Sequence, residues 1–143
     1  MPANYCNPFY RPGDDLTAVA TATVVGKRCL KISGNRQAYP GAAGSEATTV
    51  GTGNISVAHA DAGGRIFGVS KYDAAPGDLN GGQVGVIRGS KVVLPLTCSA
   101  NLTAFQEVEV TTNGMVGPKA SGVAIGYAVT AAAANTDAQI SLY

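Results

Sequence analysis

The sequence has no tryptophan, few other aromatic residues and few charges. Its 143 residues include 3 Phe and 6 Tyr, and only 13% are Asp, Glu, Lys or Arg. A core built from alanine, valine and threonine buries little area per residue, so this composition favours thin β-rich layers joined by tight turns. The net charge is +1 and the basic residues are scattered, so we expect no binding to nucleic acid.

Disulfide patterns, membrane spans and secretion signals are also missing. The cysteines Cys6, Cys29 and Cys98 are odd in number and far apart, so we expect free thiols in a reducing compartment. The longest apolar run, at residues 127–134, is too short to cross a membrane. The first residues have no basic stretch followed by an apolar run. We therefore expect a protein that is made in the cytoplasm and has no membrane partner.

No group of residues has the spacing of a catalytic or metal site. His59 is the only histidine, and Asp61 would share its face of a strand, but zinc is usually held by three or four protein ligands. A phosphate-binding loop and a G-x-S-x-G nucleophile motif are both absent. We expect no enzyme activity, no metal and no cofactor, and a small hydrolase built around His59 is the weakest alternative.

One pattern of apolar residues, glycine and a small-residue turn occurs twice along the chain, with Gly68 and Gly126 in equivalent places. Each copy is predicted to be strand, strand, turn and strand, and the first copy carries an inserted loop at about residues 35–64. Three strands alone would expose two edges, so two copies are expected to close together. We predict an all-β fold, a small β-barrel or sandwich made of two related three-strand halves.

Period-two alternation predicts the individual strands. Residues 16–25 alternate alanine with threonine or valine, which favours a strand over a helix. Val108 and Val110 are expected to face inward between outward glutamates, and the Asn-Gly pair that follows predicts a hairpin turn. Pro95 predicts that its strand lies at a sheet edge or ends its pairing there, because proline has no N–H to donate.

Residues 1–15 differ from the rest and are predicted to form an extended N-terminal arm, followed by a single β-barrel domain at 16–143. Prolines in this segment disfavour both helix and interior strand. The arm either folds back on its own domain or grips a neighbouring subunit. The candidate contact residues are Tyr5, Phe9, Tyr10 and Arg11.

Four segments carry a family signature: YRPGDDLTAVATATVVGKR, GGRIFGVSKYDAAPGD, QVGVIRGSKVVLPL, and the C-terminal part from EVEVTTNGMV to GVAIGYAVTAAAANTDAQISLY. They resemble the small head-decoration (capsid cement) proteins of tailed bacteriophages, formerly described only as a domain of unknown function. The resemblance covers nearly the whole chain. Two positions depart from the pattern: Phe105 stands where a small residue, often glycine, is expected, and Cys29 stands where an apolar aromatic residue is usual.

This resemblance implies a structural protein that adds to the outer surface of an assembled phage head after synthesis in the host cytoplasm. It implies contact with the major capsid protein and self-association as a trimer at three-fold positions, where the protein clamps neighbouring capsid subunits. The alternative from another class is a carbohydrate- or host-surface-binding β-domain that uses the 35–64 loop. The absence of tryptophan disfavours this alternative, since sugar sites usually stack on aromatic rings and Tyr39 is the loop's only one.

Overall fold

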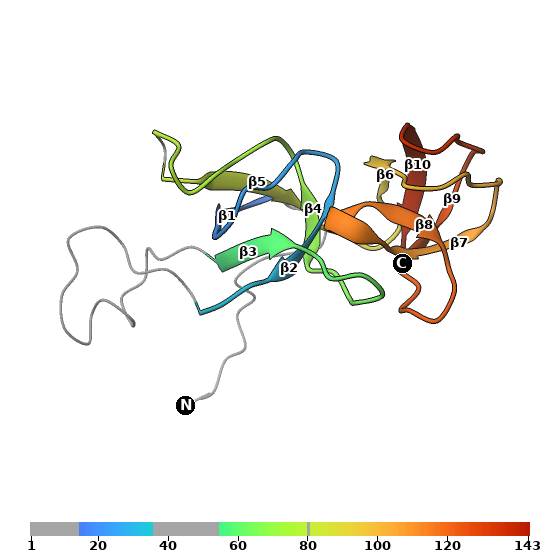
Figure 1. Cartoon of the computed structure of the whole chain (residues 1–143), viewed down its shortest axis with the longest axis horizontal. Helices are drawn as coiled ribbons and strands as arrows, with labels where there is room; N and C mark the ends of the chain where they lie inside the picture. The colour runs from blue at the N-terminus through green and yellow to red at the C-terminus, as the bar shows by residue number, and fades with distance from the viewer. Residues whose placement is uncertain (1–14, 36–54, 80) are drawn as a thin grey trace, which may run out of the picture.

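The chain folds into two five-stranded units that lie side by side (Figure 1). The computed structural model describes residues 15–35, 55–79 and 81–143. Within these ranges there is no α-helix, and the one helical element is a short 3-10 turn, η1 (Thr112–Gly114). The all-β fold predicted from the sequence is confirmed.

The first unit, called here the N-terminal barrel, is a closed sheet. Its strands pair in the order β1-β3-β2-β4-β5, and β5 pairs back onto β1. The β1–β3 pair is parallel and the other pairs are antiparallel. Closure leaves no free edge for pairing with another chain. The strands are β1 (Leu16–Ala20), β2 (Cys29–Ile32), β3 (Ile55–His59), β4 (Gly68–Ser70) and β5 (Gln83–Ile87).

The second unit, called here the C-terminal sheet, has the order β6-β10-β9-β7-β8. Its two outer strands meet only through one parallel bridge, between Cys98 and Val116, which corresponds to the parallel β1–β3 pair. β6 is thus an edge strand, as Pro95 predicts. The strands are β6 (Val93–Thr97), β7 (Glu107–Val110), β8 (Val116–Pro118), β9 (Gly126–Ala128) and β10 (Asp137–Leu142).

The two units share the same strand order and equivalent strand pairings, which confirms the internal repeat. Gly68 pairs with Leu30 in the N-terminal barrel, and Gly126 pairs with Val108 in the C-terminal sheet. A Cβ on either glycine would overlap the next strand, β5 or β10, because the backbones approach closely there. Glycine is therefore required at the same place in both copies.

Each copy is larger than the three strands expected. The segment at 16–25 and the segment around Pro95 supply β1 and β6, the first strand of each copy, and β3 and β8 are further members. Three strands would leave two edges open, whereas five strands let each copy bring its last strand back to its first. The copies are therefore two complete units and not two halves of one shared barrel. The insertion in the first copy falls between β2 and β3, and residues 36–54 lie outside the described ranges.

A shared apolar core joins the two units. Cys29, Ala60 and Val69 belong to the N-terminal barrel, yet they are buried against the interior of the C-terminal sheet, where Val108 and Val110 are also fully buried. This burial confirms that the two valines of β7 face inward. The outer face of β2 and β4 is thus the surface on which the second unit packs.

The β7–β8 hairpin strengthens the same junction. Asn113 and Gly114 both have positive φ, 53° and 72°, which confirms the predicted Asn-Gly turn. A Cβ on Gly114 would lie 2.6 Å from the carbonyl oxygen of Cys29. Backbone hydrogen bonds also cross the junction, from the Thr97 N–H to the Lys27 carbonyl at 3.1 Å.

Candidate partner-binding surfaces

The four arm residues proposed as contacts, Tyr5, Phe9, Tyr10 and Arg11, lie outside the described residues. The described chain begins at Asp15, whose carboxylate pairs with the Lys71 ammonium at 2.7 Å. It then enters β1 beside β5.

His59 has a structural role in the N-terminal barrel. Its Nε2 accepts a hydrogen bond from the Val25 N–H at 2.9 Å, so the ring is held in its neutral form. Burial, and to a smaller extent the positive charge of Arg28, lowers the pKa of His59 below its usual value. Asp61 pairs instead with Lys31, at 2.7 Å. Among the described residues, no three His, Cys, Asp or Glu side chains gather into a metal-binding group.

Two of the three cysteines can be placed, and both are free and buried thiols. Burial raises the pKa of the Cys29 thiol to about 12, so at neutral pH it is protonated and unreactive. The Cys98 thiol donates to the carbonyl oxygens of Ala133 and Thr136, at 3.1 and 3.2 Å. Cys6 lies outside the described residues.

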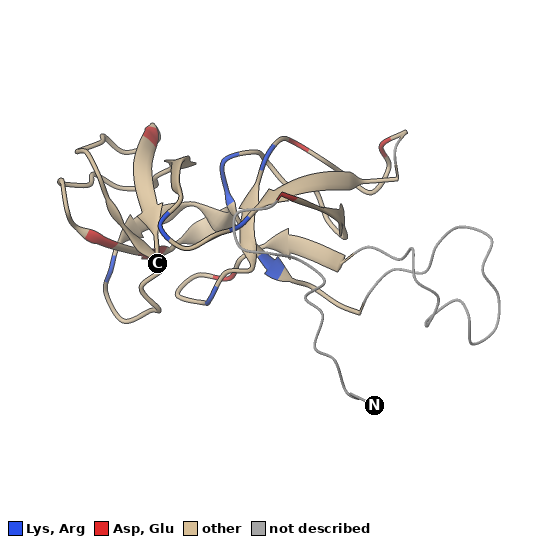
Figure 2. Cartoon of the chain, turned by 180° about the vertical axis from the view of Figure 1, so that it is seen from behind, with Lys and Arg blue, Asp and Glu red and all other residues tan. Residues whose placement is uncertain are grey.

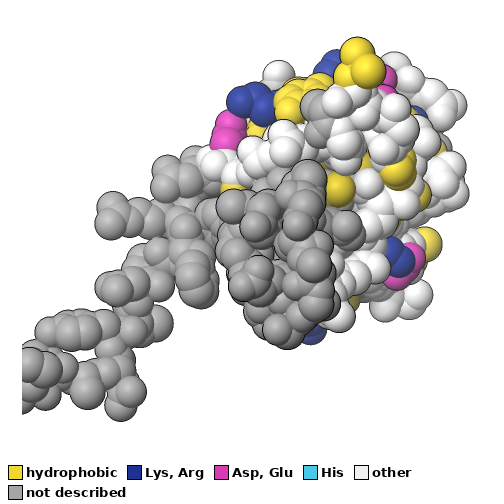
Figure 3. Space-filling view, turned by 90° about the vertical axis from the view of Figure 1, so that its left-hand side faces the viewer, with side chains coloured by type: hydrophobic (Ala, Val, Ile, Leu, Met, Phe, Trp, Pro, Cys, Tyr) yellow, Lys and Arg dark blue, Asp and Glu magenta, His cyan; other side chains and the backbone are white. Residues whose placement is uncertain are grey.

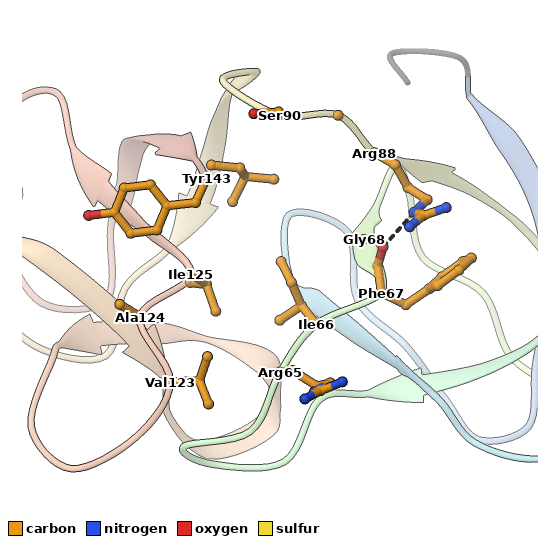
Figure 4. A pocket seen from close by; sticks show the side chains of 12 residues that line it. Arg65, Ile66, Phe67, Gly68, Arg88, Ser90, Val123, Ala124, Ile125 and Tyr143 are labelled. Atoms are coloured by element: carbon orange, nitrogen blue, oxygen red, sulfur yellow. Dashed lines mark hydrogen bonds between the residues drawn. The ribbon is translucent and has the colours of Figure 1, made fainter. Parts of the chain in front are cut away.

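A groove of about 470 Å³ runs between the two units (Figure 4). Its lining comes from the β3–β4 link, the residues after β5, the residues before β9 and the last two residues of the chain, and none of the 12 is acidic. The Arg88 guanidinium lies over the Phe67 ring, 4.2 Å from its centroid, and its Nε donates to the Phe67 carbonyl at 2.8 Å. The groove is named below the inter-unit groove. Its residues are Arg65, Ile66, Phe67, Gly68, Arg88, Gly89, Ser90, Val123, Ala124, Ile125, Leu142 and Tyr143.

Exposed aromatic rings gather on the outer face of the C-terminal sheet. Phe105 is 80% exposed and stacks on Tyr127 with ring centroids 5.0 Å apart. The Tyr143 ring lies 6.1 Å from Tyr127, and its hydroxyl donates to the Glu107 carboxylate at 2.6 Å. That hydrogen bond raises the pKa of Tyr143. These four residues, Phe105, Glu107, Tyr127 and Tyr143, are called the aromatic face.

The aromatic face was not predicted from the sequence, although Phe105 stands out there as a departure from the family pattern. Phe105 has φ +68°, in the left-handed region that glycine adopts most readily. The expectation of a small residue at this position therefore has a physical basis. An exposed aromatic residue at a glycine-type position was the one available signal.

Charges form no large patch of one sign in Figures 2 and 3. Lysines, arginines and carboxylates are spread over both units in Figure 2, and Figure 3 shows acidic and basic side chains next to each other at the end formed by the N-terminal barrel. Three lysines are paired with aspartates within the described residues. No helix found in the described ranges is long and apolar enough to cross a membrane.

The fold defines the chain as a tandem of two related small β units. Neither the family models nor the curated proteins give a match to this sequence. A solved structure with the same fold is the N base of the head fibre gp8.5 of bacteriophage phi29. It superposes with a TM-score of 0.66 and 17% sequence identity, and the match covers 91% of this chain and 93% of that one.

Proposed function

We propose that this protein is a structural component of a bacteriophage head that binds the outer surface of the assembled capsid. The observation that carries the proposal is the fold shared with the phi29 head-fibre base, since the match covers almost the whole of both chains. The sequence resemblance to capsid cement proteins leads to the same class of protein independently.

In this role the protein contacts the major capsid protein, stabilises the contacts between capsid subunits, and self-associates as a trimer at three-fold positions. It would be made in the host cytoplasm and carried on the virion exterior. The described surface suits a binding role: it has exposed aromatic rings and an apolar groove with two arginines, which are side chains favoured in interface centres.

The arm is the proposed anchor on the head, through the following residues: Tyr5, Phe9, Tyr10 and Arg11. Each aromatic side chain buried in a partner's groove contributes about 1.5–3 kcal/mol of transfer free energy. Ordering each arm residue opposes this by about 1–2 kcal/mol. Because every ordered residue carries this cost and only three residues of the arm are aromatic, the arm should contribute to binding chiefly when all three rings are buried together and few other residues become ordered.

A binding experiment with heads tests the proposal. Purified protein is mixed with heads that lack it, from the phage that encodes it, and the bound fraction is measured by sedimentation. We expect saturable binding with a fixed number of copies per head. Heads that take up no protein, or take it up without saturation, would contradict the proposed function.

A further inference from the structure

The C-terminal sheet exposes the face that corresponds to the buried junction face of the N-terminal barrel. In the N-terminal barrel, Cys29 pairs with Val69 across β2 and β4, and both side chains are buried against the second unit. The equivalent pair across β7 and β9 is Glu107 with Tyr127. Within the described residues, Phe105 and Tyr143 of the same unit lie against this pair, but neither Glu107 nor Tyr127 belongs to a buried core; the pair forms the centre of the aromatic face.

Phe105 occupies the position equivalent to Lys27. Both residues have positive φ, +63° for Lys27 and +68° for Phe105, and both N–H groups donate to the corresponding strand, β4 or β9. In the N-terminal barrel, this position contacts the other unit, because the Lys27 ammonium pairs with Asp137 at 2.6 Å. Among the described residues, the Phe105 ring stacks on Tyr127 of its own unit and is 80% exposed, although its backbone is strained for a bulky residue.

A strained and exposed aromatic residue that lies outside the core indicates a functional contact. Glycine would adopt the same φ without strain, and the ring adds nothing to the buried clusters of either unit. A partner that covers the Phe105 ring would give the residue the burial that its own chain does not provide.

The inter-unit groove has the properties that complement the aromatic face. Ile66 and Val123 supply apolar walls, and Arg65 and Arg88 supply two guanidinium groups (Figure 4). Neither arginine pairs with a carboxylate among the described residues. The aromatic face offers what these groups bind: ring surfaces for the apolar walls and for guanidinium stacking, and the Glu107 carboxylate for an ion pair.

We propose that the aromatic face of one copy docks into the inter-unit groove of a second copy of this chain, in a head-to-tail contact. This contact would be the interface of the self-association proposed above, and the inference therefore rests on the proposed function. Tyr143 belongs to both surfaces, so the two lie next to each other on one molecule. A head-to-tail contact forms a ring if its rotation closes and a filament if it does not. A ring of three copies would give the trimer proposed above.

Sedimentation velocity of the pure protein tests the contact without any phage head. We expect the wild-type chain to assemble into a trimer as its concentration rises, and Phe105→Gly to remain a monomer. Glycine suits the φ of this position, so the variant should fold at least as well as the wild type. Leu79→Ser is the matched control, because Leu79 is fully exposed and lies outside both surfaces, and this variant should assemble normally.

A mixing experiment tests the head-to-tail arrangement. Arg65→Glu damages the groove and leaves the aromatic face intact, while Phe105→Gly does the reverse. Arg65 is exposed and is not part of a buried core, so its replacement should not affect folding. We expect each variant alone to be monomeric and the mixture to form dimers, since one intact junction is possible but a ring is not.

Three outcomes would overturn the proposal. A wild-type chain that stays monomeric at its highest soluble concentration would remove the contact and the solution self-association together, while head binding would stand or fall separately. Normal assembly of Phe105→Gly or Arg65→Glu would show that self-association uses another surface. A mixture that contains no dimers would exclude the head-to-tail arrangement.

Discussion

Alanine at Gly126 should destabilise the protein more than alanine at Gly68, although the two positions are equivalent in the repeat. At Gly68 an added Cβ would lie 2.5 Å from Cγ1 of the buried Val86 side chain and 2.8 Å from the backbone oxygen of Ile87, so only one of its two closest contacts is with backbone. At Gly126 the added Cβ meets backbone atoms of Ser141 and Leu142 in β10. Those atoms cannot shift without loss of the β9–β10 pairing.

The magnitudes follow from overpacking, which costs about 1–3 kcal/mol and occasionally more. We expect about 1–2 kcal/mol for Gly68→Ala and about 3 kcal/mol for Gly126→Ala, within that range. At about 2–4 °C per kcal/mol for a chain of this size, Gly126→Ala should lower Tm by about 6–12 °C. Gly77→Ala is the control, because nothing lies within 4 Å of its Cβ position and its φ is not positive.

Thermal unfolding followed by circular dichroism, with urea titration as a second measure, gives the free energies of unfolding. Gly77→Ala should leave Tm unchanged or raise it slightly. If Gly126→Ala has the same Tm as the Gly77→Ala control, the backbones of β9 and β10 do not approach closely at Gly126. The pairing register that relates the two copies would then be wrong as well.

Three further predictions concern thiols, pH and the arm. In a Cys6→Ser background, a thiol reagent should label neither Cys29 nor Cys98 until the protein unfolds, and rapid labelling of the native protein would contradict their burial. Because folding lowers the pKa of His59, its contribution to stability is complete above its ordinary pKa of about 6.5 and is lost as the pH falls through the lower, folded value. The fall in Tm below that pH should shrink in His59→Gln, and an identical pH profile would show that another group is responsible. Deletion of residues 2–12 should leave Tm little changed and weaken binding to heads; equal affinity of the deleted and full-length chains would leave the 35–64 loop as the next candidate for the anchor.

Local patterns predicted the repeat and much of its interior. The equivalence of Gly68 and Gly126 was visible in the sequence, because close backbone approach demands glycine in both copies. The inward valines of β7 and the Asn113–Gly114 turn also followed from alternation and turn chemistry.

The number of strands per copy could not be obtained in the same way. β8 is only three residues long, and β3 pairs in parallel with β1 across a long separation in sequence. Such pairing depends on contacts that no local period encodes.

The junction between the two units and the candidate binding surfaces could not be predicted from the sequence either. Cys29 and Val69 lie on the outer side of their strands and are buried only because the second unit covers them. Their equivalents, Glu107 and Tyr127, have no such cover, and that contrast appears only when the two registers are compared.

The central claim, that this protein binds the outside of a phage head, is tested most directly by an electron cryomicroscopy reconstruction of heads saturated with the protein. The account predicts additional density on the outer surface at three-fold positions, into which three copies of the two-unit fold can be placed. A reconstruction in which the outer surface is identical with and without the protein, or in which the added density lies inside the shell, would contradict it.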